Sequence, residues 1–225
     1  MAAMFKLNAT IGVACVGLIV TACTSESAEP DLSKADIANI RNLRPDFAAA
    51  FKVTDIAPTA IDPRIVEPQK LPPAIKFEPA DCAKFANQQV LPAGVKGNMA
   101  ALTAEGEGNR FIVIAVETSE KVPVNGPPEN CKKVGFAGPA MRGLIEVVDA
   151  PKIDGVETQA AHRVVQTSVG GKTRTGELYN YVARFGTMLV IVTANPLVIP
   201  DKPVAPVDTK RAGELLTAGV SAVKA

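Results

Sequence analysis

The chain has few of the residues on which most catalytic and nucleic-acid sites depend. Its 225 residues include no Trp, two Tyr and one His, and aromatic residues make up 4% of the sequence. Stacking platforms for bases or sugars are therefore scarce, and any His-based metal or acid–base chemistry rests on His162 alone. Neither sign of charge dominates, because 24 Lys and Arg are balanced by 23 Asp and Glu. This composition gives no electrostatic argument for binding nucleic acid.

Long hydrophobic runs are also scarce. The apolar run at residues 7–20 follows Lys6 and is shorter than the roughly 20 apolar residues that a spanning helix needs. Such a run after a basic residue is typical of the apolar region of a signal peptide. Over the whole chain, the hydrophobic content of 47% is that of a protein that buries a core, and the length suits one domain with appendages.

The apolar run ends in Val20–Cys23, with the sequence Val-Thr-Ala-Cys. This tetrapeptide resembles the lipobox of bacterial lipoproteins, in which the peptide is cut before the Cys and the Cys carries the lipid. The resemblance implies a signal peptide at 1–22, a lipidated Cys23 bearing acyl chains, and a flexible polar tether at 23–35. It also implies a location at the cell membrane, on the extracytoplasmic face of the envelope. An ordinary secreted protein cut by a different peptidase is the alternative.

Two cysteines remain after such processing, Cys82 and Cys131. An exported compartment permits disulfides, so we expect a structural Cys82–Cys131 bond, with a reactive free thiol as the alternative. In the loop-entropy description, a cross-link over this separation stabilises the fold by about 4 kcal/mol. The chain has no CxxC motif and no Cys/His set with zinc spacing, so neither a thioredoxin-type site nor a zinc site is indicated.

The pattern of apolar residues predicts an α+β domain over 36–225. We expect an antiparallel sheet of about five or six strands, with helices, including a C-terminal one, packed on one face. The predicted strands are 97–104, 110–117, 143–150, 157–169, 172–185 and 187–195, and the predicted helices are 31–43, 79–90 and 208–225. The Pro-rich segment 56–79 is expected to be an ordered loop.

Two of these elements carry specific expectations. The C-terminal helix has Asp208 as its N-cap and a regular apolar stripe that must pack on the sheet. The Gly170-Gly171 pair supplies the positive φ values of a two-residue hairpin turn, and in that register His162 lies opposite Tyr179.

No sequence motif indicates catalysis. The segment 170–173 (Gly-Gly-Lys-Thr) has the end of a phosphate-binding loop without its first Gly, and lies between two predicted strands. His162 lacks a local nucleophile and an orienting carboxylate, so a cross-strand pair with Tyr179 is the favoured interpretation. Glu105 and Glu107 lie in a Gly-rich turn, and Asp149, Asp154 and Glu157 flank another; solvated charges are normal there. We expect no catalytic residue, no metal and no cofactor.

The order of these features resembles a known group. After the lipobox and tether come Phe47 and the run Phe51–Val53, the Cys82 helix, Cys131 after the first hairpin, a three-strand meander and a capped C-terminal helix. This order is similar to that of mycobacterial surface lipoproteins of unassigned function and of the extracellular sensor domain of the mycobacterial Ser/Thr kinase PknH. The resemblance implies a location in the cell envelope and a binding role.

Three functions are therefore compared. The first is a membrane-anchored, non-enzymatic binding or sensor-like module, with a lipid or cell-wall ligand between the sheet and the loops at 56–79. The second is an envelope lipid carrier that holds an acylated lipid between sheet and helices. The third is a hydrolase that uses His162. We expect a monomer held to the membrane by its N-terminal lipid, with no nucleic-acid partner.

Overall fold

The computed structural model describes residues 32–66, 71–72, 74–87, 90–92, 94–123 and 126–225. The predicted signal peptide at 1–22, Cys23 and most of the predicted tether at 23–35 lie outside the described residues. Their assignments therefore stay predictions.

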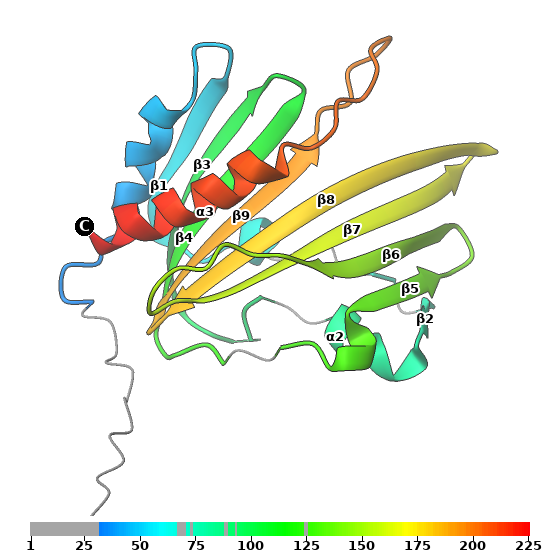
Figure 1. The fold of residues 1–225 in the computed structure, drawn as a ribbon, viewed down its shortest axis with the longest axis horizontal. Coiled ribbons are helices and arrows are strands. Elements are labelled where there is room, and N and C mark those ends of the chain that lie inside the picture. The colour runs from blue at the N-terminus through cyan, green and yellow to red at the C-terminus, as the bar shows by residue number, and fades with distance from the viewer. Residues whose placement is uncertain (1–31, 67–70, 73, 88–89, 93, 124–125) are drawn as a thin grey trace, which may run out of the picture.

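The described chain is built on one antiparallel sheet of nine strands, in the order β1-β3-β4-β9-β8-β7-β6-β5-β2 (Figure 1). The strands are β1 (Lys52–Ala60), β2 (Lys76–Glu78), β3 (Gly97–Gly106), β4 (Asn109–Thr118), β5 (Lys133–Ala137), β6 (Met141–Val148), β7 (Glu157–Val169), β8 (Lys172–Phe185) and β9 (Met188–Pro196). The helical elements are η1 (Ile37–Asp46), α1 (Pro63–Val66), η2 (Ala80–Cys82), α2 (Ala83–Ala86), η3 (Glu129–Cys131) and α3 (Thr209–Lys224).

The predicted fold class is wrong in its strand number and in its proportion of helix. The sheet has nine strands rather than five or six, and all of the described helical elements except η1 and α3 have three or four residues. The prediction missed β1, β2 and β5. The strand β1 lies at one sheet edge, where Pro58 falls inside a register shift between Ile56 and Thr59, as an edge strand tolerates.

The other two missed strands are short. The strand β2 has three residues and forms the opposite edge, where β5 is its one partner among the described strands. The strand β5 has five residues and directly follows Cys131 and Lys132. The strand β2 is too short to show an alternating pattern, whereas β5 does alternate, with Val134 and Phe136 buried, and the sequence analysis missed it. The segment 56–79, predicted as an ordered loop, therefore contains the end of β1 as well as α1 and β2.

The long central hairpin agrees with its prediction. The strands β7 and β8 pair over their whole length, and His162 lies opposite Tyr179. The turn residues Gly170 and Gly171 have φ of 58° and 74°, values that L side chains rarely adopt.

One face of the sheet is covered by η1 and α3, and we call it the helix face. The helix α3 lies across the central strands, with its C-terminal end beside η1 (Figure 1). Asp208 caps α3 by accepting a hydrogen bond from the Arg211 N–H at 2.9 Å. The predicted apolar stripe is buried, namely Ala212, Leu215, Leu216, Gly219, Val220 and Val223. A continuous core of side chains therefore fills the space between α3 and the sheet.

The opposite face, which we call the groove face, is covered by irregular segments rather than by helices. Over β3, β4 and β9 it is covered by Val66, Val90, Leu91 and Val122. Over β5 and β6 it is covered by the residues around the Cys82–Cys131 disulfide and by Phe85. Because both faces of the central strands are covered, those strands are apolar on both sides.

Candidate functional site

A concave groove lies on the groove face, between the two covered regions. Its volume is about 420 Å³, and its floor is formed by β6, β7 and β8. This volume lies in the range of small-molecule sites in proteins, which is about 300–1,000 Å³. The groove is therefore a preformed concavity of a size that suits a small ligand.

Side chains alternate between the two faces of a strand, and this alternation determines which residues form the floor of the groove. On β8, the even-numbered positions 178–184 point into the groove, while Tyr179 and Tyr181 point to the helix face. On β7, Ala161 lies opposite Asn180, which places its side chain on the same face. The apolar lining comes mainly from Ile145, Val147, Ala161, Leu178 and Val182 on the strands and from Phe85, Ala86 and Val90 on the wall.

An arginine lies near each end of the groove. Arg184 is at the C-terminal end of β8, and Arg163 lies opposite Leu178, six positions away along the same strand. At about 3.3 Å per residue, the two backbone positions are about 20 Å apart. The groove is thus an elongated apolar surface between two cationic side chains.

Arg184 is the more deeply buried of the two. It is 9% exposed, and its Nη1 donates to Gln159 Oε1 at 3.1 Å. Its Nε is buried and has no hydrogen-bond partner within the described part of the chain. Burial lowers the pKa of Arg184, and the carboxylate of Glu157 opposes this effect only in part. Burial also lowers the pKa of the half-buried Arg163.

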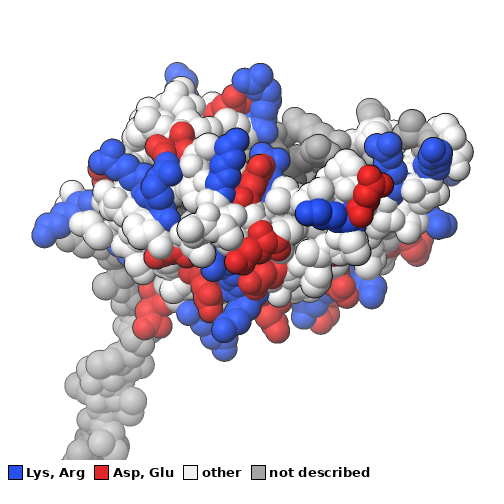
Figure 2. Space-filling view, turned by 90° about the horizontal axis from the view of Figure 1, so that it is seen from above, with Lys and Arg blue, Asp and Glu red and all other residues white. Residues whose placement is uncertain are grey.

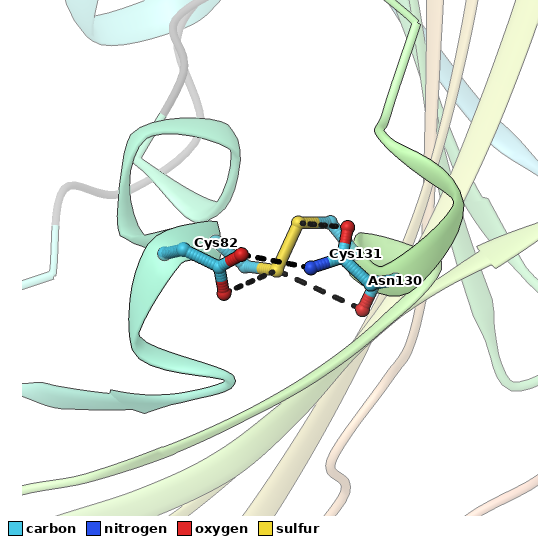
Figure 3. The surroundings of a disulfide bond; sticks show 4 residues. Cys82, Asn130 and Cys131 are labelled. Atoms are coloured by element: carbon cyan, nitrogen blue, oxygen red, sulfur yellow. Dashed lines mark hydrogen bonds between the residues drawn. A yellow bond between two sulfur atoms is a disulfide. The ribbon is translucent and has the colours of Figure 1, made fainter.

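The disulfide fixes one wall of the groove. It joins Cys82, the last residue of η2, to Cys131, directly before β5. Both cysteines are almost fully buried, and Asn130 Nδ2 donates to Asp81 Oδ2 at 2.8 Å beside them (Figure 3). Because α2 directly follows Cys82, the bond holds the helix that carries Phe85 and Ala86 against the sheet. The predicted pair is thus present in the structure.

His162 lies on the helix face, away from the groove. Its ring stacks on Tyr179 with 4.1 Å between ring centroids and 9° between the planes. Its Nε2 lies 3.2 Å from Glu177 Oε2. No hydrogen bond within the described residues joins His162 to a Ser, Thr or Cys side chain that could act as a nucleophile. The structure therefore places His162 in a cross-strand pair, as the sequence analysis favoured.

The other charged residues considered as site candidates do not form a cluster among the described residues. Glu105 pairs with Arg110 at 3.3 Å, across the β3–β4 hairpin from it. The described residues contain no group of three His, Cys, Asp or Glu side chains that could hold a metal ion. In the view of Figure 2, Lys and Arg are interspersed with Asp and Glu, and no field of one sign covers that face. No described helix is long and apolar enough to span a membrane.

The sequence analysis missed the groove. Arg163, Arg184 and Phe85 come from separate parts of the chain, and none of them belongs to a recognisable motif. The one available signal is on β8, where an apolar strand face ends in Arg184 immediately before Phe185. An arginine at such a position is usually solvated, so this signal alone identifies no site.

The comparisons with known proteins place the chain in a family. The family described as "Domain of unknown function (DUF5642)" matches residues 36–224, and the chain belongs to it. An X-ray structure of an uncharacterized protein from Mycobacterium smegmatis, described as the Rv0999 ortholog, is similar with a TM-score of 0.82 and 59% identity. That match covers 86% of this chain and 100% of that chain.

The predicted resemblance to the kinase sensor domain is found only as a weak match. The crystal structure of the extracellular domain of PknH from Mycobacterium tuberculosis has a TM-score of 0.42 and 13% identity, and the match covers 84% of this chain and 91% of that chain. A likeness at this level carries no argument about function. No curated protein matches the chain. The descriptions of the family and of the Mycobacterium smegmatis structure name no enzymatic activity.

Proposed function

We propose that this member of the DUF5642 family is a non-enzymatic, ligand-binding module of the cell envelope, and that the groove on β6–β8 is its binding site. The observation that carries the proposal is the groove itself. It combines about 420 Å³ of preformed, mostly apolar concavity with a few polar groups, as small-molecule sites do. Its position differs from the expected one beside 56–79, since its wall is formed by α2 and Val90.

The envelope location rests on two arguments. The tetrapeptide that ends at Cys23 resembles a lipobox, and lipidation there would anchor the domain to the membrane through its N-terminus. The disulfide between Cys82 and Cys131 supports an oxidising compartment outside the cytoplasm, because structural disulfides are rare inside it. A sensor-like role would add to ligand binding a protein partner that responds to the bound state.

The lipid-carrier alternative needs a different place for the lipid from the expected one between sheet and helices. Between the sheet and α3, side chains such as Leu216 and Val220 are buried and fill the space. A carried lipid would therefore occupy the groove on the opposite face, with part of its acyl region outside. This alternative differs from the main proposal in the size of the ligand and in the need to release it.

The test is to purify the protein from its own envelope and to identify co-purified molecules by native mass spectrometry and extraction. A groove-filling variant, Ala161→Trp, is compared with Thr175→Trp, which adds the same ring to an exposed position on β8 that points to the other face. We expect a bound molecule in the wild type and in Thr175→Trp, and its loss in Ala161→Trp. Equal occupancy in all three proteins would refute the groove as the site.

The anchor has a separate test. Metabolic labelling with a fatty acid should label the wild-type chain and leave Cys23→Ala unlabelled. Labelling of Cys23→Ala, or no labelling of the wild type, would refute lipidation at this residue and leave the groove proposal standing.

A further inference from the structure

The lining of the groove carries an excess of positive charge that the rest of the protein does not share. Its charged residues are Lys152, Arg163 and Arg184 against Asp149 alone, an excess of two positive charges. The whole chain has a formal net charge of +1 at pH 7. The groove is therefore a local cationic site on a nearly neutral protein, and such a site favours an anion.

Not every hydrogen-bond donor of Arg184 has a partner among the described residues. Its guanidinium is buried, donates to the neutral amide of Gln159 through Nη1, and leaves Nε without a partner among the described residues. Glu157 is opposite Arg184 in the β7–β8 register, yet its side chain is exposed and its effect on the pKa of Arg184 is smaller than that of burial. Buried charges are normally paired, because an unpaired one is costly.

The geometry around Arg184 indicates which ligand groups could accept hydrogen bonds from its guanidinium. A guanidinium presents its N–H donors in a planar fork that matches a carboxylate or a phosphate. From Arg184, the floor continues along β8 over Val182 and Leu178 until it reaches Arg163. A ligand that contacts both regions needs an anionic head and an apolar part.

We infer that the groove binds an anionic amphiphile, with its carboxylate or phosphate on Arg184 and its apolar part along β8 toward Arg163. This inference rests on the proposed function and adds the chemical class of the ligand. The head meets the guanidinium of Arg184 from the groove, and the exposed Lys152 adds positive charge at the rim of the groove. The apolar part replaces water on the lining formed by Val182, Leu178 and Val90.

The test uses the folded domain, residues 32–225, because the relative at 59% identity was crystallised as a chain that matches along its whole length. The probes are decanoate, decyl phosphate and uncharged 1-decanol, which share one alkyl chain and differ in the head. Affinity is measured by calorimetry below the micelle concentration, and the Arg184 Nε–H signal is followed by NMR. We expect at least one anion to bind about tenfold or more tightly than the alcohol and to shift that signal.

The variants separate charge from packing. Arg184→Gln should reduce the affinity for the anion about tenfold or more and leave that for decanol unchanged, while Lys210→Gln, an exposed change on α3, should alter neither. Arg184→Lys keeps the charge without the planar fork, and an intermediate affinity is expected; it replaces Arg184→Gln if that variant fails to fold. The ratio of decanoate to decyl phosphate affinity distinguishes a carboxylate ligand from a phosphate ligand.

Three results would overturn the inference. Equal binding of the alcohol and the anions would leave a binding groove without anion selectivity, so the proposed function would survive. Anion binding that does not move the Arg184 signal would place the head elsewhere. Failure of every probe to bind would overturn the inference, and the absence of any co-purified molecule would in addition overturn the proposed function.

Discussion

Removal of the Cys82–Cys131 disulfide should destabilise the fold by about 4 kcal/mol. The two cysteines are separated by 49 positions. In the chain-entropy model, closing a loop of this length lowers the entropy of the unfolded chain by about 14 cal/mol/K, or about 4 kcal/mol at 25 °C. For a domain of this size, such a loss corresponds to a fall in Tm of about 8–16 °C. The variant is Cys82→Ala/Cys131→Ala, which removes the cross-link and leaves no free thiol at either position.

The assay is urea unfolding of the wild type and of the double variant, followed by circular dichroism. The unfolded ensemble without the cross-link exposes more surface, so the dependence of the free energy of unfolding on urea should become steeper. The anion affinity of the groove is measured in parallel, because the disulfide holds the α2 wall that carries Phe85. A loss of stability below about 1 kcal/mol, with an unchanged slope, would refute the reasoning from loop length.

Three further predictions concern the helix face. Gly219→Val should destabilise by about 1–3 kcal/mol in the same assay, because a Cβ there lies 2.9 Å from Val190 Cγ1, and Thr217→Val on the exposed side of α3 should not; equal effects would contradict this packing. Asp208→Ala should cost about 1 kcal/mol through loss of the α3 cap, and Asp208→Asn should recover most of it; a neutral Asp208→Ala would count against the cap. Burial raises the pKa of both tyrosines of the chain, Tyr179 and Tyr181, and the carboxylate of Glu177 contributes at Tyr179. Since the folded-state pKa values lie above the unfolded value of about 10, this contribution to stability is complete below pH 10 and is lost as the pH rises through the folded-state values. Absorbance at 295 nm should show phenolate forming at higher pH in the folded than in the urea-unfolded protein, and coincident titrations would refute the shift.

The central strands could be predicted because their signals are local. The hairpin of β7 and β8 follows from the Gly170-Gly171 turn, and the register that pairs His162 with Tyr179 follows from the length of that turn. The apolar residues of α3 recur with a helical period, and Asp208 caps the helix at its N-terminus. In each case, a few neighbouring residues determine the element and its orientation.

The edges of the sheet and the groove could not be predicted in this way. The strand β1 contains Pro58 and is almost entirely exposed, so neither its composition nor its burial pattern distinguishes it from a loop. The groove brings Phe85 and Val90 against β7 and β8, about 70 to 100 positions later in the chain. This contact between distant segments depends on the order of strands in the sheet. The residues next to Arg184 in the sequence therefore do not identify the groove.

A crystal structure of the domain with decanoate or decyl phosphate, whichever binds more tightly, tests the central claim most directly. The account predicts electron density for the probe on the groove face, with its head within hydrogen-bond distance of the Arg184 guanidinium and its alkyl chain extending over Val182 toward Leu178. Density for the probe on the helix face, or an empty groove at saturating probe, would contradict it.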